Sequence, residues 1–411
     1  MKRIASMALL LALTPPIVQA QDWLPDPALV EAAIAEQPGV RAAMRRTDAA
    51  GAQARARAVG PHEFEVSAIA QERKIDVDDG TERYDEYEAQ LGRAFRWPGK
   101  VALDRQIGEY GISASELRLD DARHEAARVF LKYWLDWLRA SEQSAEAAEQ
   151  FESLSRERTA LARRVQLGDA AAKDLDLLDV ELAQADATRL AMNGALVDAE
   201  AAIAHDFPTL PLPERVPALG DPQELPETPT AWVNRIVQRS HEIGALEADA
   251  MQADALAARS RADRLPDPTL ALRLMNDRGG AERVVGLVFT MPVGGRHRSA
   301  LASADGASAA ALHGDTQAKR REIEREAEQA VRKVEQARMQ WLAQQRALSA
   351  SDGARKRMRR GWELGELSLA EWLLAERTHR QIALAEASAR ADAEEARLGV
   401  LVDSHELWHA D

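Results

Sequence analysis

The chain has 411 residues, a formal net charge of -14 and no cysteine. The acidic balance argues against a broad cationic face for nucleic acid, and the lack of thiols excludes disulfides and thiolate metal sites. With 29 % charged and only 5 % aromatic residues, the composition favours long solvated helices over a compact globule.

The N-terminal stretch has the pattern of a secretory signal. Two basic residues precede an apolar run from Ile4 to Leu13, and a small-residue motif ends at Ala20. A charged start, a short apolar region and small residues before the cleavage point are typical of a signal peptide. We therefore predict that residues 1–20 are a signal peptide. A buried N-terminal helix is less favoured, because the run is short and proline follows it.

The rest of the chain consists of two similar segments, 21–207 and 230–411. The linker between them, 208–229, contains seven prolines and cannot continue a helix or a central strand. In the same order, each segment contains an opening helix, two strands, a helix of roughly 60 residues, a Leu-Gly turn and another long helix. This shared order predicts an internal duplication.

Four segments alternate apolar and polar residues as β-strands do: 62–71, 84–97, 268–276 and 283–291. In the last of them, Val285, Leu287 and Phe289 share one face. Strands of about 9–11 residues with one apolar face are typical of transmembrane barrels, although a soluble sheet shows the same alternation in any single strand. We expect a long outer loop at 73–82 and a short hairpin turn at Gly279–Gly280.

The long helices carry apolar residues at coiled-coil spacing, for example Leu178, Leu182 and Ala185 in the first segment. Such a seam predicts helices that pack nearly parallel, as hairpins. Four strands are too few for a closed membrane barrel, which needs about eight, and open edges in lipid cost several kcal/mol for each unpaired group. Three chains are therefore expected to pool twelve strands.

These features together resemble the TolC-type outer-membrane efflux proteins over nearly the whole mature chain. The resemblance rests on the paired repeats, the strand pairs that end in WPGK or PVGGR, and the Leu-Gly turn before a leucine- and acid-bearing helix. It implies a mostly α fold with a small β part. The two tandem repeats of coiled-coil helices and β-hairpins would form a homotrimer, whose twelve-stranded outer-membrane β-barrel continues as a periplasmic α-helical tunnel.

The resemblance also implies a function, that of a passive exit duct in the outer membrane of a Gram-negative bacterium. The duct would work with a periplasmic adaptor protein and an inner-membrane pump of the RND type. The short chain and short linker are similar to the heavy-metal branch of the family, the cobalt-zinc-cadmium type, so heavy-metal cations are the expected cargo. Drugs or a type I secreted protein are alternatives, and a periplasmic coiled-coil scaffold is an alternative of another class.

The family's adaptor contacts, carried over by motif, fall on Leu167 and Gly168 and on Leu364 and Gly365. Both glycines would also serve as plain left-handed helix ends. In a trimer, the acids that follow the turns at equivalent positions, Asp174 and Glu371, would form a ring at the periplasmic aperture and favour cations. The alternative is that each acid stabilises the N-terminus of its own helix.

The sequence HELWH, His405 to His409, matches the zinc-protease pattern H-E-x-x-H. Such a site also needs both histidines on one face of a helix, a third ligand and a cleft. A solvated tail is the favoured interpretation. No nucleophile elbow, P-loop or dinucleotide fingerprint occurs in the sequence, so we expect no catalytic residue, no cofactor and no metal site.

Overall fold

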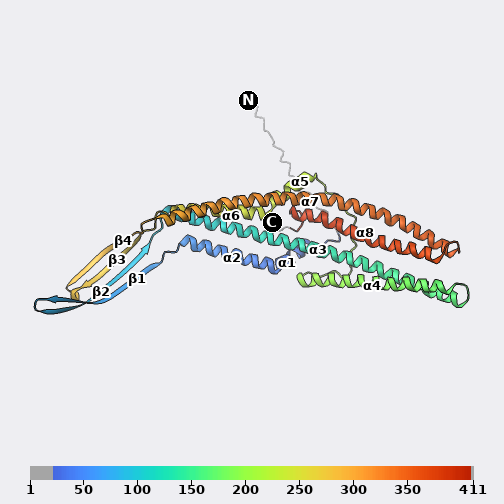
Figure 1. Ribbon diagram of the computed structural model, residues 1–411, viewed down its shortest axis with the longest axis horizontal. Helices are drawn as coiled ribbons and strands as arrows, with labels where there is room; N and C mark the ends of the chain where they lie inside the picture. Colours follow the sequence, from blue (N-terminus) through green and yellow to red (C-terminus); the bar gives the residue numbers. More distant parts are fainter. Residues whose placement is uncertain (1–21, 409–411) are drawn as a thin grey trace, which may run out of the picture. The chain divides into compact units, whose positions relative to one another are not determined.

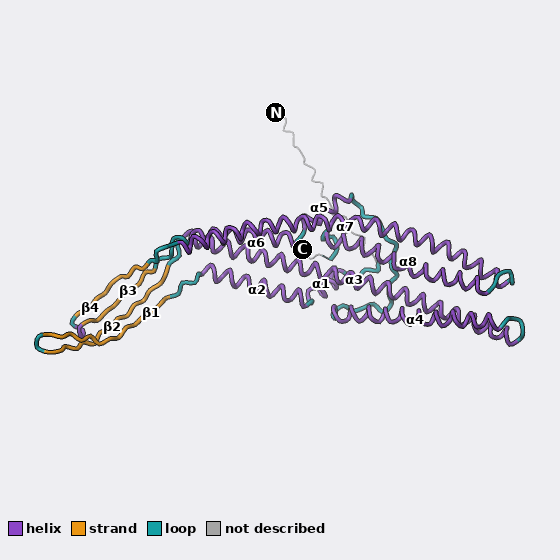
Figure 2. Tube along the Cα trace, in the orientation of Figure 1, coloured by secondary structure: helices purple, strands orange, loops and turns teal. Residues whose placement is uncertain are grey.

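The computed structural model describes residues 22–408, and the predicted signal at 1–20 lies outside the described residues. The chain is mostly helical, as predicted (Figure 1). Its helices are α1 (Pro27–Ala35), α2 (Pro38–Val59), α3 (Pro98–Gln166), α4 (Ala172–Asp206), α5 (Pro229–Arg239), α6 (His241–Ala262), α7 (Arg296–Glu363) and α8 (Leu369–Asp403). The strands, orange in Figure 2, are β1 (Phe64–Val77), β2 (Gly80–Ala94), β3 (Thr269–Asp277) and β4 (Glu282–Thr290).

The chain divides into two compact units, and each unit combines corresponding pieces of both sequence repeats. One unit holds Ala127–Trp232 and Gln329–Asp411 together with the start of the chain, and the other holds Gln37–Ala126 and Val233–Glu328. Each unit is therefore discontinuous in the sequence. Within residues 22–408, no helix combines the length and apolarity needed to cross a membrane.

The second unit contains one antiparallel sheet with the strand order β1-β2-β3-β4. Its central pairing, β2 with β3, joins the hairpins of the two repeats. Val66, Leu91, Leu272 and Leu287 stand in one row across the four strands, on a face that is apolar and exposed. The opposite face mixes polar and apolar residues. Ile69, Glu88, Met275 and Val284 stand in one row across it, and Glu88 pairs with Arg273 at 2.6 Å. The predicted alternation of faces is confirmed.

The predicted long loop at 73–82 is wrong, because the first hairpin continues through it. Arg73 pairs with Tyr84 and Val77 pairs with Gly80, so that only two residues remain for the turn. Polar residues suit a strand whose faces are both exposed, and the Thr81 hydroxyl donates to Asp76 Oδ1 at 2.9 Å. The predicted turn at Gly279–Gly280 is confirmed, with φ angles of 64° and 96°.

Arg96, in the corner between β2 and α3, closes the C-terminus of α2. Its guanidinium donates to the carbonyl oxygens of Arg57, Ala58 and Val59 at 2.7–2.8 Å. These are the carbonyls that a helix end leaves without an intrahelical partner. Arg96 also pairs with the buried Asp104 at 2.7 Å, so that one side chain joins the end of one helix to the first turns of the next.

Lys100 links the two repeats inside the same unit. Its ammonium is 2 % exposed and donates to the Leu265 carbonyl at 2.7 Å and to Asp263 and Asp267 at 2.8 Å each. Burial raises the pKa of Asp267, but hydrogen bonds from Lys100 and His62 lower it further, so the pKa lies below its ordinary value. The corner after β2 is thereby fixed to the corner before β3.

We predict that Lys100→Met lowers the free energy of unfolding by about 3–5 kcal/mol, because buried carboxylates lose their partner. Denaturant unfolding followed by circular dichroism would measure the loss. The matched control is Lys74→Met, since Lys74 is exposed and pairs with Glu72 at 3.4 Å. That variant should cost at most about 1 kcal/mol. Equal losses in the two variants would contradict the role given to Lys100.

Candidate functional site

The two Leu-Gly turns lie in the first unit and join α3 to α4 and α7 to α8. Gly168 has a φ of 82°, its N–H donates to the Val165 carbonyl at 3.0 Å, and the Asp169 N–H donates to the Arg164 carbonyl at 2.8 Å. This pair of hydrogen bonds is a Schellman motif, which satisfies the last carbonyls of a helix.

The second turn repeats this geometry. Gly365 has a φ of 75° and donates to the Trp362 carbonyl at 3.0 Å, and Glu366 donates to the Gly361 carbonyl at 2.9 Å. A Cβ at either turn glycine would meet no atom within 4 Å, so backbone conformation and not crowding requires glycine there. Leu167 and Leu364 are exposed and present apolar side chains at the two turns.

The acid after each turn occupies the third position of its helix. Glu371 forms a capping box: its carboxylate accepts from the Ser368 N–H at 2.8 Å, and its own N–H donates to the Ser368 hydroxyl at 3.3 Å. These hydrogen bonds lower the pKa of Glu371. Asp174 occupies the equivalent position on α4, but the residue before that helix is Ala171, which has no side chain to cap it.

A shared core holds the helices together behind the turns. Leu161 of α3, Leu178 of α4 and Leu373 of α8 are buried in one cluster. Trp362 stacks on Trp372, with ring centroids 4.6 Å apart and planes inclined by 11°. The two hairpins therefore pack against each other within this unit.

Sequence reasoning missed an ionic contact between α4 and α8. The buried Glu181 pairs with Arg377, and Arg380, which is 5 % exposed, lies 3.8 Å from the same carboxylate. Glu181 falls between apolar seam positions and could have been noticed as a charge on an otherwise apolar stripe. Its arginine partners come from the other repeat, and no pattern within one repeat would have identified them.

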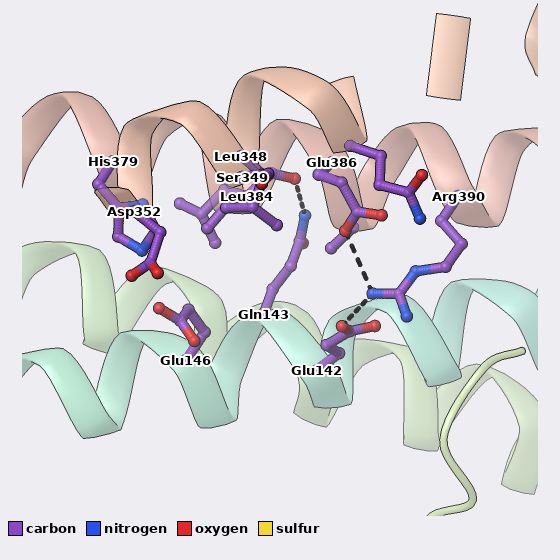
Figure 3. A pocket seen from close by; sticks show the side chains of 13 residues that line it. Glu142, Gln143, Glu146, Leu348, Ser349, Asp352, His379, Leu384, Glu386 and Arg390 are labelled. Atoms are coloured by element: carbon purple, nitrogen blue, oxygen red, sulfur yellow. Dashed lines mark hydrogen bonds and ion pairs between the residues drawn. The ribbon is translucent and has the colours of Figure 1, made fainter. Parts of the chain in front are cut away.

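A cavity of about 490 Å³ lies farther along the same unit, between α3, α7 and α8 (Figure 3). At one end, Arg390 bridges Glu142 and Glu386. Beside them, the Gln143 amide of α3 donates to the Leu384 carbonyl at 3.2 Å and the Ser388 hydroxyl at 2.9 Å. These contacts join α3 to α8 across the junction of the helices.

At the other end of the cavity, Glu146, Asp352 and His379 lie near one another (Figure 3). Burial and the neighbouring Glu149 raise the pKa of Glu146, and burial beside Arg355 lowers that of His379. Hydrogen bonds from Lys356 and Arg355 lower the pKa of Asp352 to about 2. Among residues 22–408, no three histidine or carboxylate side chains are placed to hold a metal ion.

The described part of the HELWH motif does not lie on a helix. Helix α8 ends at Asp403, and His405 and Trp408 have φ angles of 59° and 51°. His409 lies outside the described residues. The helical geometry that a zinc site of this type requires is therefore not met by the described residues.

Solved outer-membrane channels share this fold. The Campylobacter jejuni CmeC outer membrane channel matches with a TM-score of 0.73 and 16 % identity, over 93 % of this chain and 86 % of that one. A membrane protein from Pseudomonas aeruginosa matches with a TM-score of 0.75 and 19 % identity, over 95 % and 98 %. The open state of the Neisseria gonorrhoeae MtrE outer membrane channel matches with a TM-score of 0.70 and 18 % identity, over 92 % and 88 %. No protein-family model and no curated protein matches the sequence.

We predict that Gly168→Ala and Gly365→Ala each lower the stability of the helical hairpins by about 1–2 kcal/mol, the cost of a left-handed conformation with a Cβ. The matched control is Gly306→Ala in α7, where φ is helical and nothing lies within 4 Å of the added Cβ. That change should stabilise the protein by about 0.5–1 kcal/mol. Thermal unfolding of the purified variants would show opposite signs, and a loss at Gly306 equal to that at the turns would contradict the explanation.

The raised pKa of Glu146 predicts a pH dependence of stability. A group whose pKa is higher in the folded state stabilises the fold below its ordinary value of 4.5, and this contribution is lost as the pH rises through the raised pKa. Glu146→Gln should therefore be more stable than the wild type near pH 7 and gain nothing at pH 4. Denaturant midpoints measured across this range provide the test, and an equal gain at both pH values would contradict it.

Proposed function

We propose that the protein is the outer-membrane channel of a tripartite efflux system, a passive exit duct that performs no covalent chemistry. The observation that carries the proposal is a fold shared with solved outer-membrane channels over more than nine-tenths of the chain, at TM-scores near 0.7. In this proposal the helices line a periplasmic tunnel, the strands cross the outer membrane of a Gram-negative bacterium, and an inner-membrane pump supplies the energy.

The sheet supports the membrane part of the proposal. Its apolar face exposes Val66 and Leu287 at 75 % each and Phe289 at 65 %. Among the described residues, β1 pairs with β2 alone and β4 with β3 alone, so each has an edge without a partner strand. In lipid such edges must be paired, and three copies would supply a closed barrel of twelve strands.

The exposed side chains at the two Leu-Gly turns support the proposal of a periplasmic adaptor as partner. Leu167 and Leu364 expose apolar side chains beside glycines in the same backbone geometry, and we propose that a periplasmic adaptor protein docks there. The inner-membrane pump would be of the RND type. Asp174 and Glu371 remain the proposed acidic ring near the aperture, with Glu371 also capping its own helix.

Heavy-metal cations are the cargo that we propose, because the short chain and short linker resemble the heavy-metal branch of such channels. The shared fold itself does not name the cargo. A deletion strain should become sensitive to zinc, cobalt, cadmium, copper or silver salts. The intact gene should restore growth, and a gene with Gly168→Val and Gly365→Val should not. Sensitivity to drugs alone would overturn the metal proposal, and no phenotype for any cargo would contradict the duct.

Substitutions at two adjacent residues of β1 test the proposal that the strands cross the outer membrane. Val66→Arg places a charge on the apolar face and should cost about 2–4 kcal/mol near the middle of a bilayer. The variant is therefore expected to lose most of its insertion into the outer membrane, measured as heat-resistant oligomer in membrane extracts. Ser67→Arg, on the opposite face of the same strand and in a row with Gln90 and Arg273, is the control and should insert like the wild type. Equal insertion of the two variants would favour the periplasmic scaffold.

A further inference from the structure

The apolar face of the sheet carries a cation where the strands approach the helices. The last full row across the four strands on that face consists of Phe64, Arg93, Leu270 and Phe289. We call this row the helix-side border of the sheet. Both phenylalanines are about two-thirds exposed, and Arg93 is half-buried. A single arginine thus interrupts an otherwise apolar border.

Two contacts hold the Arg93 side chain at this border. Its Nε donates to the His62 carbonyl at 3.0 Å, and its guanidinium carbon lies 5.0 Å from the centre of the Phe64 ring. The terminal nitrogens Nη1 and Nη2 have no hydrogen bond or ion pair with another described residue. The end of the guanidinium, which can donate to two oxygens of one phosphate, is therefore available to a ligand.

The corner beyond the border, where teal loops join the strands to α2, α3, α6 and α7, has an excess of positive charge (Figure 2). Six exposed side chains near these helix ends have no hydrogen bond or ion pair with another described residue, and we call them the corner arginines: Arg55, Arg57, Arg105, Arg261, Arg264 and Arg296. The whole chain has a net charge of -14, so this concentration of cations is local.

The acids of the corner do not neutralise these arginines. Asp104 pairs with Arg96, and Asp263 and Asp267 pair with Lys100. Two exposed acids, Glu63 and Glu65, lie at the start of β1. Glu65 stands on the opposite face of the sheet, in a row with Gly92 and Ala271. At the border the cation is therefore on the apolar face and the nearest strand acid is on the other.

We infer that Arg93 and the corner arginines bind the phosphate headgroups of anionic phospholipids. The inference rests on the proposed function, in which lipid covers the apolar face of the sheet. Strand β4 has nine residues, which is about the length that crosses a bilayer, so Phe289 near its end lies close to the membrane surface. Aromatic side chains gather at that level, and basic residues there attract anionic lipids.

Continuity with the apolar face favours a lipid over a soluble anion. Free phosphate has no apolar part that could cover the row of Val66, Leu91, Leu272 and Leu287 next to the border. A phospholipid would place its acyl chains along that face and its phosphate where the face ends, beside Nη1 and Nη2 of Arg93. The headgroup and the chains would thus meet complementary parts of one surface.

Lipid binding to the purified full-length protein tests the inference. Native mass spectrometry after release from detergent would count bound molecules as phosphatidylglycerol, which is anionic, or phosphatidylcholine, which is zwitterionic, is added. The wild type should bind phosphatidylglycerol more tightly. Arg93→Gln should lower the affinity for phosphatidylglycerol about fivefold and leave that for phosphatidylcholine nearly unchanged. Arg93→Lys, which keeps the charge, should retain most of the preference.

Arg321→Gln is the matched control, because it removes the same charge from an exposed site on α7 about 40 Å along the helix from Arg296. It should bind phosphatidylglycerol like the wild type. Equal losses in Arg93→Gln and Arg321→Gln, or equal affinity of the wild type for the two lipids, would overturn the inference. Displacement of the lipid by an equal concentration of inorganic phosphate would overturn the assignment to a headgroup.

A second variant keeps the test decisive if Arg93→Gln does not assemble. The triple change of Arg57, Arg264 and Arg296 to Gln alters only exposed side chains without bonds to other described residues, and it should lower phosphatidylglycerol affinity at least fivefold. An unchanged affinity would count against the inference.

Membrane fractionation of the wild type separates the two ways of failing. A protein that is recovered in the outer membrane and shows no preference for anionic lipid would overturn this inference alone. Recovery in the soluble periplasmic fraction would overturn the exit duct and the inference together.

Discussion

Within residues 22–408, the four-stranded sheet leaves the outer backbone edges of β1 and β4 without partner strands, and this constraint bears on the rest of the architecture. β1 and β4 each pair with one neighbour, and the four strands expose a row of valine, leucine and phenylalanine on one face. Unpaired edge strands invite pairing with other strands, and in lipid such pairing is required. The opposite face is mixed and includes the ion pair of Glu88 with Arg273. The unpaired edges and the exposed apolar row are what the proposed pooling of strands from several copies would cover.

Two basic residues connect this sheet to its helices. The segment FRWPGK, Phe95 to Lys100, joins β2 to α3 and contains both of them, Arg96 and Lys100. Arg96 closes the end of α2, and Lys100 binds the carboxylates of Asp263 and Asp267. Both cations are buried, so each must have nearly all its partners satisfied. In the second repeat, Arg298 donates to the Asp263 carbonyl at the end of α6 at 2.9 Å, and the backbones also approach closely, since a Cβ on Gly294 would lie 2.6 Å from the Arg264 carbonyl oxygen.

Much of the fold could be predicted from the sequence, because helix and strand periodicity are local properties. Leu178 and Ala185 fall on the expected seam and are buried, and the strand faces alternate as their residues indicate. The long loop at 73–82 was predicted wrongly because polar residues do not distinguish a loop from a strand exposed on both faces. The pairing of Glu181 with Arg377 and of Lys100 with Asp267 could not be predicted, since each joins residues far apart in the chain.

The duplication explains why the two turns look alike and yet differ in detail. Both need a left-handed glycine, but Ser368 completes a capping box that Ala171 cannot form. Behind the second turn, Leu367 packs against Gly361, whose counterpart in the first turn is Arg164 beside Ala170. Substitutions of this kind let two copies of one hairpin meet different neighbours. In the proposed assembly of three chains, two unlike halves of one chain would let the contacts within a copy differ from the contacts between copies.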